Sequence, residues 1–513
     1  MFENLTIDKI QTALALSVTQ IAGLAYYNGD PWQAGAGYVG PKPPATDPNY
    51  TRVISEIQRG FVGKDIIGEI ADRHANGVVG RDVVWDVARA DDLDPTLDDE
   101  ARIAEAEALL RTWIDRTGAQ DTIDRAVATM TIAGRAGLRI LIPPGRRDEA
   151  GTVPAGAMDQ QLRHIYLDHP APDEIGIITD ADTRHVAGVY AYQDDAGQSH
   201  AEIVFRDPDN PDAIIWRILT GQGENAEPAI YYLPMAGDTI PIYEMSRRPL
   251  VSSQVLSQQR LYNLAATMKA RNVVLGGFLE RTLLNAQLVG EEKVINGQKV
   301  FVPSPLAFGP GVVNSIVGIK DADGSGGAKR STPEIQYRDP VPVDTFEATE
   351  RAAYLAILGE AHQLHYAIAG DATPSGEARI AAMADYVIDL LKTKKRVDDA
   401  WKWIGVTALN LAATLAGEPN KWAGLTIKAD AQIDAGPVSP EMMRATAEMV
   451  RDRLLSQETG RSWIGVTDTK AEAQRVDDEQ SAGALGAIDQ INQILAIDSA
   501  AQTGQAQAGQ AGA

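Results

Sequence analysis

The chain contains no cysteine among its 513 residues, and this absence excludes several kinds of protein at once. Disulfide scaffolds, cysteine-ligated zinc, iron–sulfur clusters and thiol catalysis all need that residue. The absence fits a protein that assembles in a reducing cytosol. The hydrophobic content of 44% is ordinary, so a wholly disordered chain is excluded too.

Long apolar runs and positive charge are also scarce. No stretch of about 18 uninterrupted apolar residues occurs, so we expect no helix that spans a membrane. The 47 Lys and Arg residues face 70 Asp and Glu residues, which gives a formal net charge of −23. Proteins that hold nucleic acid over most of their surface are usually basic, so only local contact with nucleic acid is expected here.

Motifs that would indicate catalysis are weak. Gly35–Gly40 matches GxGxxG, but the prolines that follow it cannot begin the helix that a dinucleotide site needs. Glu360 and His362 share an expected helix with His365 but face different sides, which argues against zinc, and Asp168–His169 has no nucleophile motif beside it. We therefore expect no cofactor, no metal and no enzymatic activity.

The first half of the chain changes from helical to β-rich patterns. Residues 1–27 predict an amphipathic helix rather than a signal peptide, and 98–135 predict another helix. Strands are predicted over 76–87 and 138–142. From 161 to 243, short β-branched runs alternate with Asp, Gly and Pro turns, which predicts an antiparallel sheet.

The second half is mostly helical and contains one distinctive arrangement. Apolar residues at three- and four-residue spacing predict two long helices, Ser252–Phe278 and Val343–Ile368, on either side of a β and loop insert. The strongest helical pattern follows over Glu377–Gly417, and a helical block runs from Ser439 to about Ile497. The tail 499–513 is low in complexity and is expected to be disordered.

Two local groups of basic residues interrupt this acidic chain. The Ser252–Phe278 helix carries three basic residues and no acid, and a second group lies on the Glu377–Gly417 helix. The two groups are Arg260, Lys269 and Arg271, and Lys392, Lys394, Lys395 and Arg396. Contact with nucleic acid, ion pairs between subunits and an ordinary helix face all fit these groups, so the alternatives stay open.

Several segments together resemble a family. The run VSSQ…QQRLYN over residues 251–263 follows a strand at Gly237–Pro241, as in the portal proteins of long-tailed double-stranded-DNA bacteriophages. Further similar segments, in the same order, are Tyr26–Asp30, Leu138–Ile142, Pro374–Ala378 and Ser439–Glu479. The resemblance lies in the order and spacing of these segments over residues 20–480.

The resemblance implies an α+β fold with the wing, stem, clip and crown of a portal, a β-rich wing segment and a predominantly helical C-terminal half. Its implied parts are a wing at 1–245, stem helix 1 at 246–278, a clip at 279–342, stem helix 2 at 343–368, a tunnel loop at 369–376, a long wing helix at 377–418, a crown at 419–498 and a disordered tail at 499–513.

The function that the resemblance implies is mechanical. Portal proteins form a closed ring, commonly of twelve subunits, at one capsid vertex, and double-stranded DNA passes through it during packaging and ejection. The implied partners are further copies of the chain, the terminase large subunit, a head–tail adaptor protein, and the major capsid and scaffolding proteins. The implied location is the virion, after assembly in the host cytoplasm.

The resemblance also assigns residues to the DNA channel. The tunnel loop would consist of Gly370, Asp371, Ala372, Thr373, Pro374, Ser375 and Gly376. Lys269 and Arg271 are the candidate cations of the lumen. Two other hypotheses remain: an enzyme that binds a nucleotide with the Gly-rich residues 28–40, and a non-viral helical scaffold.

Overall fold

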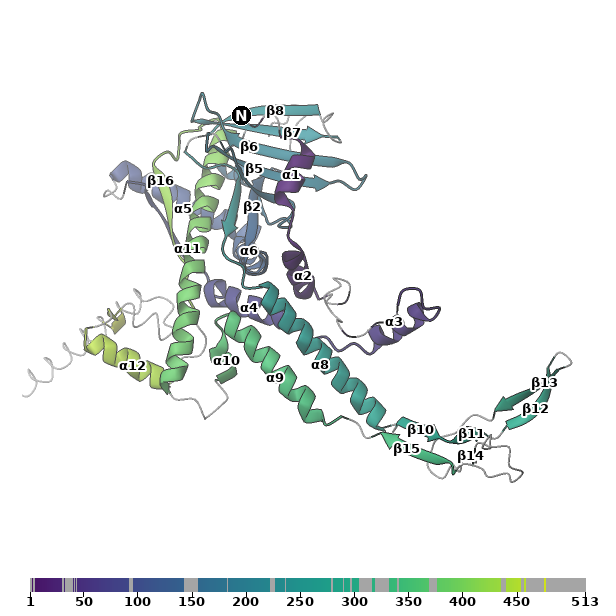
Figure 1. Cartoon of the computed structure of the whole chain (residues 1–513). Coiled ribbons are helices and arrows are strands. Elements are labelled where there is room, and N and C mark those ends of the chain that lie inside the picture. The colour runs from purple at the N-terminus through teal and green to yellow at the C-terminus, as the bar shows by residue number, and fades with distance from the viewer. Residues whose placement is uncertain are drawn as a thin grey trace, which may run out of the picture. The chain divides into compact units, whose positions relative to one another are not determined.

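Figure 1 shows the computed structural model of the chain. It describes residues 2, 5–29, 32, 40, 42, 44–91, 96–142, 156–181, 183–221, 227–235, 237–277, 280–288, 290–295, 298–303, 316–318, 332–338, 341–368, 376–434, 440–453, 456–457 and 475–476. Two compact units form, where the chain length predicts three or four. The first unit combines Met1–Gly29, Ile66–Leu256 and Ile357–Ala513, and the second combines Asp30–Asp65 and Ser257–Ala356.

The N-terminal segment forms two helices, so the single helix predicted over residues 1–27 was wrong. α1 (Ile7–Leu14) and α2 (Val18–Tyr27) are separated by a short extended segment. Ser17 and Gln20 form a capping box at the start of α2, in which the Gln20 side chain accepts a hydrogen bond from the Ser17 N–H at 2.8 Å. This cap begins a new helix where the sequence pattern suggested continuity.

The strand predicted over 76–87 was wrong in its first half. α4 (Ile66–Val79) continues the helix through residue 79, and β1 (Val84–Arg89) begins only after a short turn. The alternating pattern that suggested a strand comes from buried valines and glycines at the end of α4. Gly77 allows the side chains of α11 to approach closely, because a Cβ there would lie 2.8 Å from the Tyr386 hydroxyl.

The helix predicted over 98–135 is also divided. α5 (Leu97–Thr117) and α6 (Ala119–Ala133) meet at Gly118, whose φ of +62° is left-handed. A glycine adopts this conformation without a steric penalty and ends the first helix. Gly118 therefore determines where the helix breaks, and the spacing of apolar residues did not predict this position.

The antiparallel β segment predicted over 161–243 is confirmed, and so is the strand predicted over 138–142. A five-stranded sheet has the sequential order β4-β5-β6-β7-β8, and a three-stranded sheet has the order β3-β2-β9. Their strands are β2 (Arg135–Leu141), β3 (Tyr166–Asp168), β4 (Ile175–Thr179), β5 (Val186–Gln193), β6 (Ser199–Arg206), β7 (Ala213–Thr220), β8 (Glu227–Pro234) and β9 (Ile242–Ser246).

Both faces of the five-stranded sheet bury apolar side chains, as the period of two along each strand requires. One face packs Val189 and Ile203 against Ile10 of α1, which lies across the sheet in Figure 1. The other face packs Trp216 with Ile242 of β9. The sheet therefore has an apolar core on each face, while the edge strand β8 keeps Ile230 and Tyr232 exposed.

The helix predicted over 377–417 is confirmed as α11 (Gly376–Leu415). Its buried stripe at three- and four-residue spacing forms part of the largest core, together with α4, α5, α6 and β2. That stripe includes Leu390, Val397, Trp401, Ile404, Ala408 and Leu411. β16 (Leu425–Asp430) follows and pairs antiparallel with β1, a strand that the sequence did not predict within the segment assigned to the crown.

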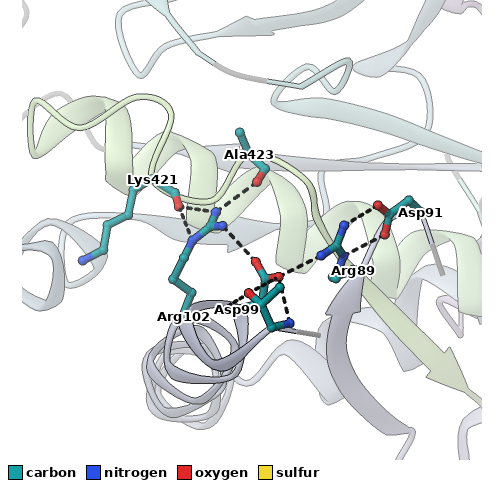
Figure 2. A network of polar contacts seen from close by, with 7 residues as sticks. Arg89, Asp91, Asp99, Arg102, Lys421 and Ala423 are labelled. Atoms are coloured by element: carbon teal, nitrogen blue, oxygen red, sulfur yellow. Dashed lines mark hydrogen bonds and ion pairs between the residues drawn. The ribbon is translucent and has the colours of Figure 1, made fainter. Parts of the chain in front are cut away.

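Hydrogen bonds and ion pairs connect the turn before β16 with α5 and β1 (Figure 2). The Arg102 guanidinium donates hydrogen bonds to the carbonyls of Lys421 at 2.7 Å and Ala423 at 3.0 Å. Arg89 pairs with Asp99 at 2.8 Å, and the capping hydrogen bond from Thr96 holds the pKa of the Asp99 carboxyl below its usual value. These contacts join the end of α11 to chain segments about 300 residues earlier.

The second unit contains α3 (Tyr50–Arg59), most of α8 (Ser253–Gly277) and α9 (Val343–Glu360), and a set of short antiparallel strand pairs. The pairs are β10 (Glu280–Leu284) with β15 (Glu334–Arg338), β11 (Ala286–Leu288) with β14 (Ile316–Gly318), and β12 (Gly290–Ile295) with β13 (Gln298–Pro303). The predicted helix Ser252–Phe278 and β character of the insert are confirmed.

The helix predicted over 343–368 was wrong at its end. α9 stops at Glu360, His362 adopts a left-handed φ of +57°, and a separate short helix α10 (Leu364–Ile368) follows. Two other helices, α7 (Met158–Leu162) and α12 (Pro440–Arg451), complete the described helices. Within the described ranges, no helix combines the length and apolar character needed to cross a membrane.

The mixture of helices and antiparallel sheets confirms the α+β class. The disordered tail predicted at 499–513 lies outside the described residues, as does most of the helical block predicted after 453.

Two glycines at helical positions give a matched test of this packing. Replacing Gly405 of α11 with Ala should destabilise the protein by roughly 1–3 kcal/mol, because a Cβ there would lie 2.5 Å from Ile427 Cγ1. Gly359→Ala in α9 should leave stability unchanged or raise it by up to about 1 kcal/mol, since no atom lies within 4 Å of the added Cβ. Thermal unfolding of both variants checks this, and equal melting temperatures would contradict the packing of α11 on β16.

Candidate functional site

α8 and α9 flank the β insert and lead directly into its first strand pair. β10 follows α8 and β15 precedes α9, and these strands pair antiparallel, with Glu280 opposite Arg338 and Leu284 opposite Glu334. Figure 1 shows the two helices and the two strands as consecutive stretches of one paired structure. We call α8, the strands β10–β15 and α9 the arm.

A row of buried polar side chains on α8 holds an extended segment of the second unit. Gln259, Asn263 and Thr267 are spaced by four residues, so they share one side of the helix, and all three are fully buried. We call these three residues the polar ladder. The apolar spacing that predicts this helix gives no signal for these polar residues.

The polar ladder binds the main chain of Val62 and Lys64. Thr267 Oγ1 accepts from the Val62 N–H at 3.0 Å, and Asn263 Oδ1 accepts from the Lys64 N–H at 3.0 Å. Gln259 Nε2 donates to the Lys64 carbonyl at 2.6 Å. The side chains of α8 thus take the place of a neighbouring β-strand for this segment and satisfy three of its main-chain groups.

α8 and α9 are joined by polar contacts nearer the insert. Lys269 Nζ lies 2.8 Å from Glu350 Oε2 and 3.9 Å from Glu347 Oε1. The hydrogen bond to Glu350 raises the pKa of the Lys269 ammonium above its ordinary value. Asn272 makes a two-way contact with the main chain of Val341, donating to its carbonyl at 2.7 Å and accepting from its N–H at 3.0 Å.

The two candidate lumen cations differ in their surroundings. Residues two positions apart on a helix point in roughly opposite directions. Lys269 faces α9 and its charge is compensated by carboxylates, whereas Arg271 is exposed and forms no ion pair with a described residue. Of the candidate tunnel loop, Gly370 to Ser375 lie outside the described residues, and Gly376 is the first residue of α11.

The outer surface of the arm carries apolar side chains. Leu261 is 39% exposed, and Val273 and Val341 are at least half exposed. Ala265 of α8 and Ala353 of α9 are buried. Leu261, Val273 and Val341 thus leave aliphatic groups in contact with water.

The residues that precede α8 are fixed by a buried cluster in the first unit. Arg247 Nη2 lies 2.8 Å from Asp389 Oδ2, and Arg247 Nη1 donates to the Thr393 hydroxyl at 2.7 Å and to His74 Nε2. Burial and the neighbouring Arg247 charge lower the pKa of His74 to about 3, so the imidazole is neutral and accepts at Nε2. This cluster joins α4, α11 and the end of β9 by side chains that sequence periodicity did not identify.

Residues that could suggest catalysis have structural roles. His169 contacts the Gly137 carbonyl at 2.8 Å and the Thr129 hydroxyl, and Asp168 pairs with Arg139 at 3.1 Å. His365 packs against the Tyr386 ring, and its pKa falls to about 4 through burial and the nearby Arg73 charge. The part of the chain that the structure describes holds no group of three or more His, Asp or Glu side chains arranged to bind a metal.

The Gly-rich segment weighed as a nucleotide site is only partly described. Asn28 caps the end of α2, and Gly29 follows with a left-handed φ of +82°. Gly35 and Gly37 lie outside the described residues. The described end of this segment is therefore a helix C-terminus, which presents carbonyl groups and not the N–H groups that bind phosphate.

Comparison with known proteins finds no family model and no curated protein that matches this chain. The resemblance to portal proteins is therefore supported only by the sequence segments described above.

The polar ladder can be tested by removing its central member. Asn263→Ala deletes the acceptor used by the Lys64 N–H and by the Gln259 amide, so we expect a loss of about 1–3 kcal/mol. Hydrogen exchange at residues 60–65 should become faster. Gln254→Ala, an exposed position on the same helix, should leave that exchange unchanged. Unaltered protection in Asn263→Ala would show that the segment is held by other contacts.

The buried His74 should make stability depend on pH. Its folded pKa of about 3 lies below the ordinary value of 6.5, so the unfolded chain binds a proton that the folded chain does not. Stability then falls as pH decreases from 6.5 towards 3, by about 2 kcal/mol between pH 7 and pH 5. Urea unfolding of His74→Gln should show a pH dependence smaller by this amount. His185→Gln, at an exposed position, is the matched control.

Proposed function

We propose that this chain is a portal-type protein that forms a ring at one capsid vertex of a tailed double-stranded-DNA bacteriophage. In this proposal the ring is the channel for DNA packaging and ejection and the platform on which terminase and a head–tail adaptor dock. The arm carries the proposal, because two long helices on either side of a small β insert occur where the resembling segments place the stem and clip.

The construction of the arm supports a mechanical role. Side-chain contacts to main-chain groups of Val62, Lys64 and Val341 hold the helices and their neighbouring segment in register. Such contacts do not depend on ligand binding or on a titrating group near neutral pH. The proposed role therefore includes no catalytic step, and terminase is the partner that supplies the driving force.

The charges of the arm also suit a duplex that must slide. Affinity for DNA rises with the number of phosphates that basic side chains neutralise. Lys269 is compensated by two glutamates, and Arg271 alone of the two candidate cations is exposed without an ion pair to a described residue. Weak and sparse phosphate contact is consistent with a strongly acidic chain of net charge −23.

The remaining parts of the proposal follow from the resemblance. Residues 369–376 would line the narrow part of the channel, the insert between α8 and α9 would form the clip, and helices after residue 439 would form the crown. The proposed location is the portal vertex of the virion, and the proposed further partners are the major capsid and scaffolding proteins.

Mass measurement and imaging test the proposal directly. Twelve copies of the 55.0-kDa chain have a mass of roughly 660 kDa, and a ring of that size should show a central hole by negative-stain microscopy. Light scattering of the purified protein, alone and after co-expression with capsid and scaffolding proteins, should report the assembly. A monomer at every concentration in both preparations would contradict the proposed function.

A further inference from the structure

The middle of α11, from residue 388 to residue 402, has a solvent-facing surface with an unusual composition. Four cations and two aliphatic side chains share this side of the helix, and the aliphatic pair, Ile388 and Leu391, is 52% and 50% exposed. The exposed cations are Lys392, Lys395, Arg396 and Lys402. We call these six residues the basic face; Asp385 and Asp399 lie among them on the same side of the helix, and four cations against two carboxylates leave a positive net charge.

The cations of the basic face have no acidic partner in the described part of the chain. Lys394, which belongs to the same basic group in the sequence, points towards β16 and lies 2.7 Å from Asp398 and close to Asp430. None of the four exposed cations forms an ion pair with a described residue. Lys394 is thus paired within the chain, whereas Lys392, Lys395 and Arg396 are exposed and have no ion pair with a described residue.

The exposed aliphatic residues indicate a protein partner for this surface. A DNA backbone offers phosphates and sugars, and it gains little by covering Ile388 and Leu391. Protein interfaces instead combine apolar side chains with a polar rim, and on the basic face Ile388 and Leu391 adjoin the cations. A partner that fits would present carboxylates around a surface that can cover two aliphatic side chains.

The same chain carries such carboxylates on α4 and α6. Asp72 and Asp121 are exposed, and Asp124 lies near both. Burial raises the pKa of the Asp124 carboxyl, and repulsion from the Asp72 and Asp121 carboxylates raises it further. The nearby Arg125 guanidinium donates to the Asp121 carbonyl and the Thr122 hydroxyl. We call Asp72, Asp121 and Asp124 the acidic face.

The two faces lie on opposite sides of the packed α4 and α11 helices. Tyr386 and His74 belong to the contact between these helices, through the Tyr386 hydroxyl bond to the Arg73 carbonyl and the bond between His74 and Thr393. Ile388 and Asp72 are each two residues away from these contact residues, roughly 200° around their helices. Each face therefore points away from the helix that carries the other.

We propose that the basic face of α11 binds the acidic face of α4 and α6 in a second copy of this chain. Because one copy presents different surfaces on its two sides, the contact is heterologous, and repetition of a heterologous contact gives a ring or an open helical assembly. The inference rests on the proposed ring-forming function and assigns the charged surfaces that join neighbouring subunits in the first unit.

Cysteine cross-linking tests the contact without background, because the natural chain has no cysteine. The double variant Lys395→Cys/Asp121→Cys, treated with a short bismaleimide, should give a ladder of trimers and higher species. Each single variant should give at most dimers, because only one of the two faces then carries a thiol. A double variant that stops at the same species as the single variants would overturn the proposal.

Charge reversal gives an independent test. Lys392→Glu/Lys395→Glu should weaken association at least tenfold at physiological salt, and adding Asp72→Lys/Asp121→Lys should restore it. Arg52→Glu/Arg59→Glu on the exposed side of α3 is the matched control with the same change in charge. Association of the natural chain should also weaken in 1 M salt, where the screening length falls to about 3 Å.

The outcomes separate this inference from the proposed function. Rings that form normally with the reversed basic face would overturn the contact and leave the ring function standing. Equal weakening by the α3 control, or no restoration by the compensating reversal, would also overturn it. A natural chain that stays monomeric in both preparations would remove the ring function and the contact together.

Discussion

The buried ion pair between Arg247 and Asp389 is the interaction on which the arrangement of the first unit depends. A buried charge is strongly destabilising unless it has a partner and further hydrogen bonds, and Thr393 and His74 provide those bonds. Three separate chain segments must therefore come together before this arginine is satisfied. The requirement fixes the end of β9 relative to α4 and α11, and so determines where the chain begins α8.

Within the second unit, the same problem of buried polar groups is solved differently. There the polar ladder satisfies main-chain groups of an extended segment, and Lys269 and Asn272 connect α8 with α9. Position within the arm is thus specified mainly by hydrogen-bond geometry, while its aliphatic side chains remain partly exposed to water.

Periodicity predicted the β-rich segment, α8 and α11, because each has a long run with one consistent pattern, and the α+β class was implied by the resemblance. It failed where a single residue changes the chain direction, as at Gly118 and His362, or where a cap such as Ser17 interrupts an apolar run. β16 was missed because its partner strand lies more than 300 residues away, and no local pattern encodes such a pairing. The polar ladder can be seen in the sequence as three polar residues four positions apart. It was overlooked because the helix was predicted from its apolar residues.

The polar ladder binds main-chain atoms, so the contact depends on the side chains of α8 and not on those of the bound segment. Gln259, Asn263 and Thr267 must keep their side chains, whereas Val62 and Lys64 contribute backbone groups that every residue except proline possesses. Mutations can therefore accumulate in the bound segment while its position is preserved. Two chains that have diverged in this way would keep the same contact although few residues of the bound segment are identical. The feature they would share in sequence is a helix with three regularly spaced amide or hydroxyl side chains.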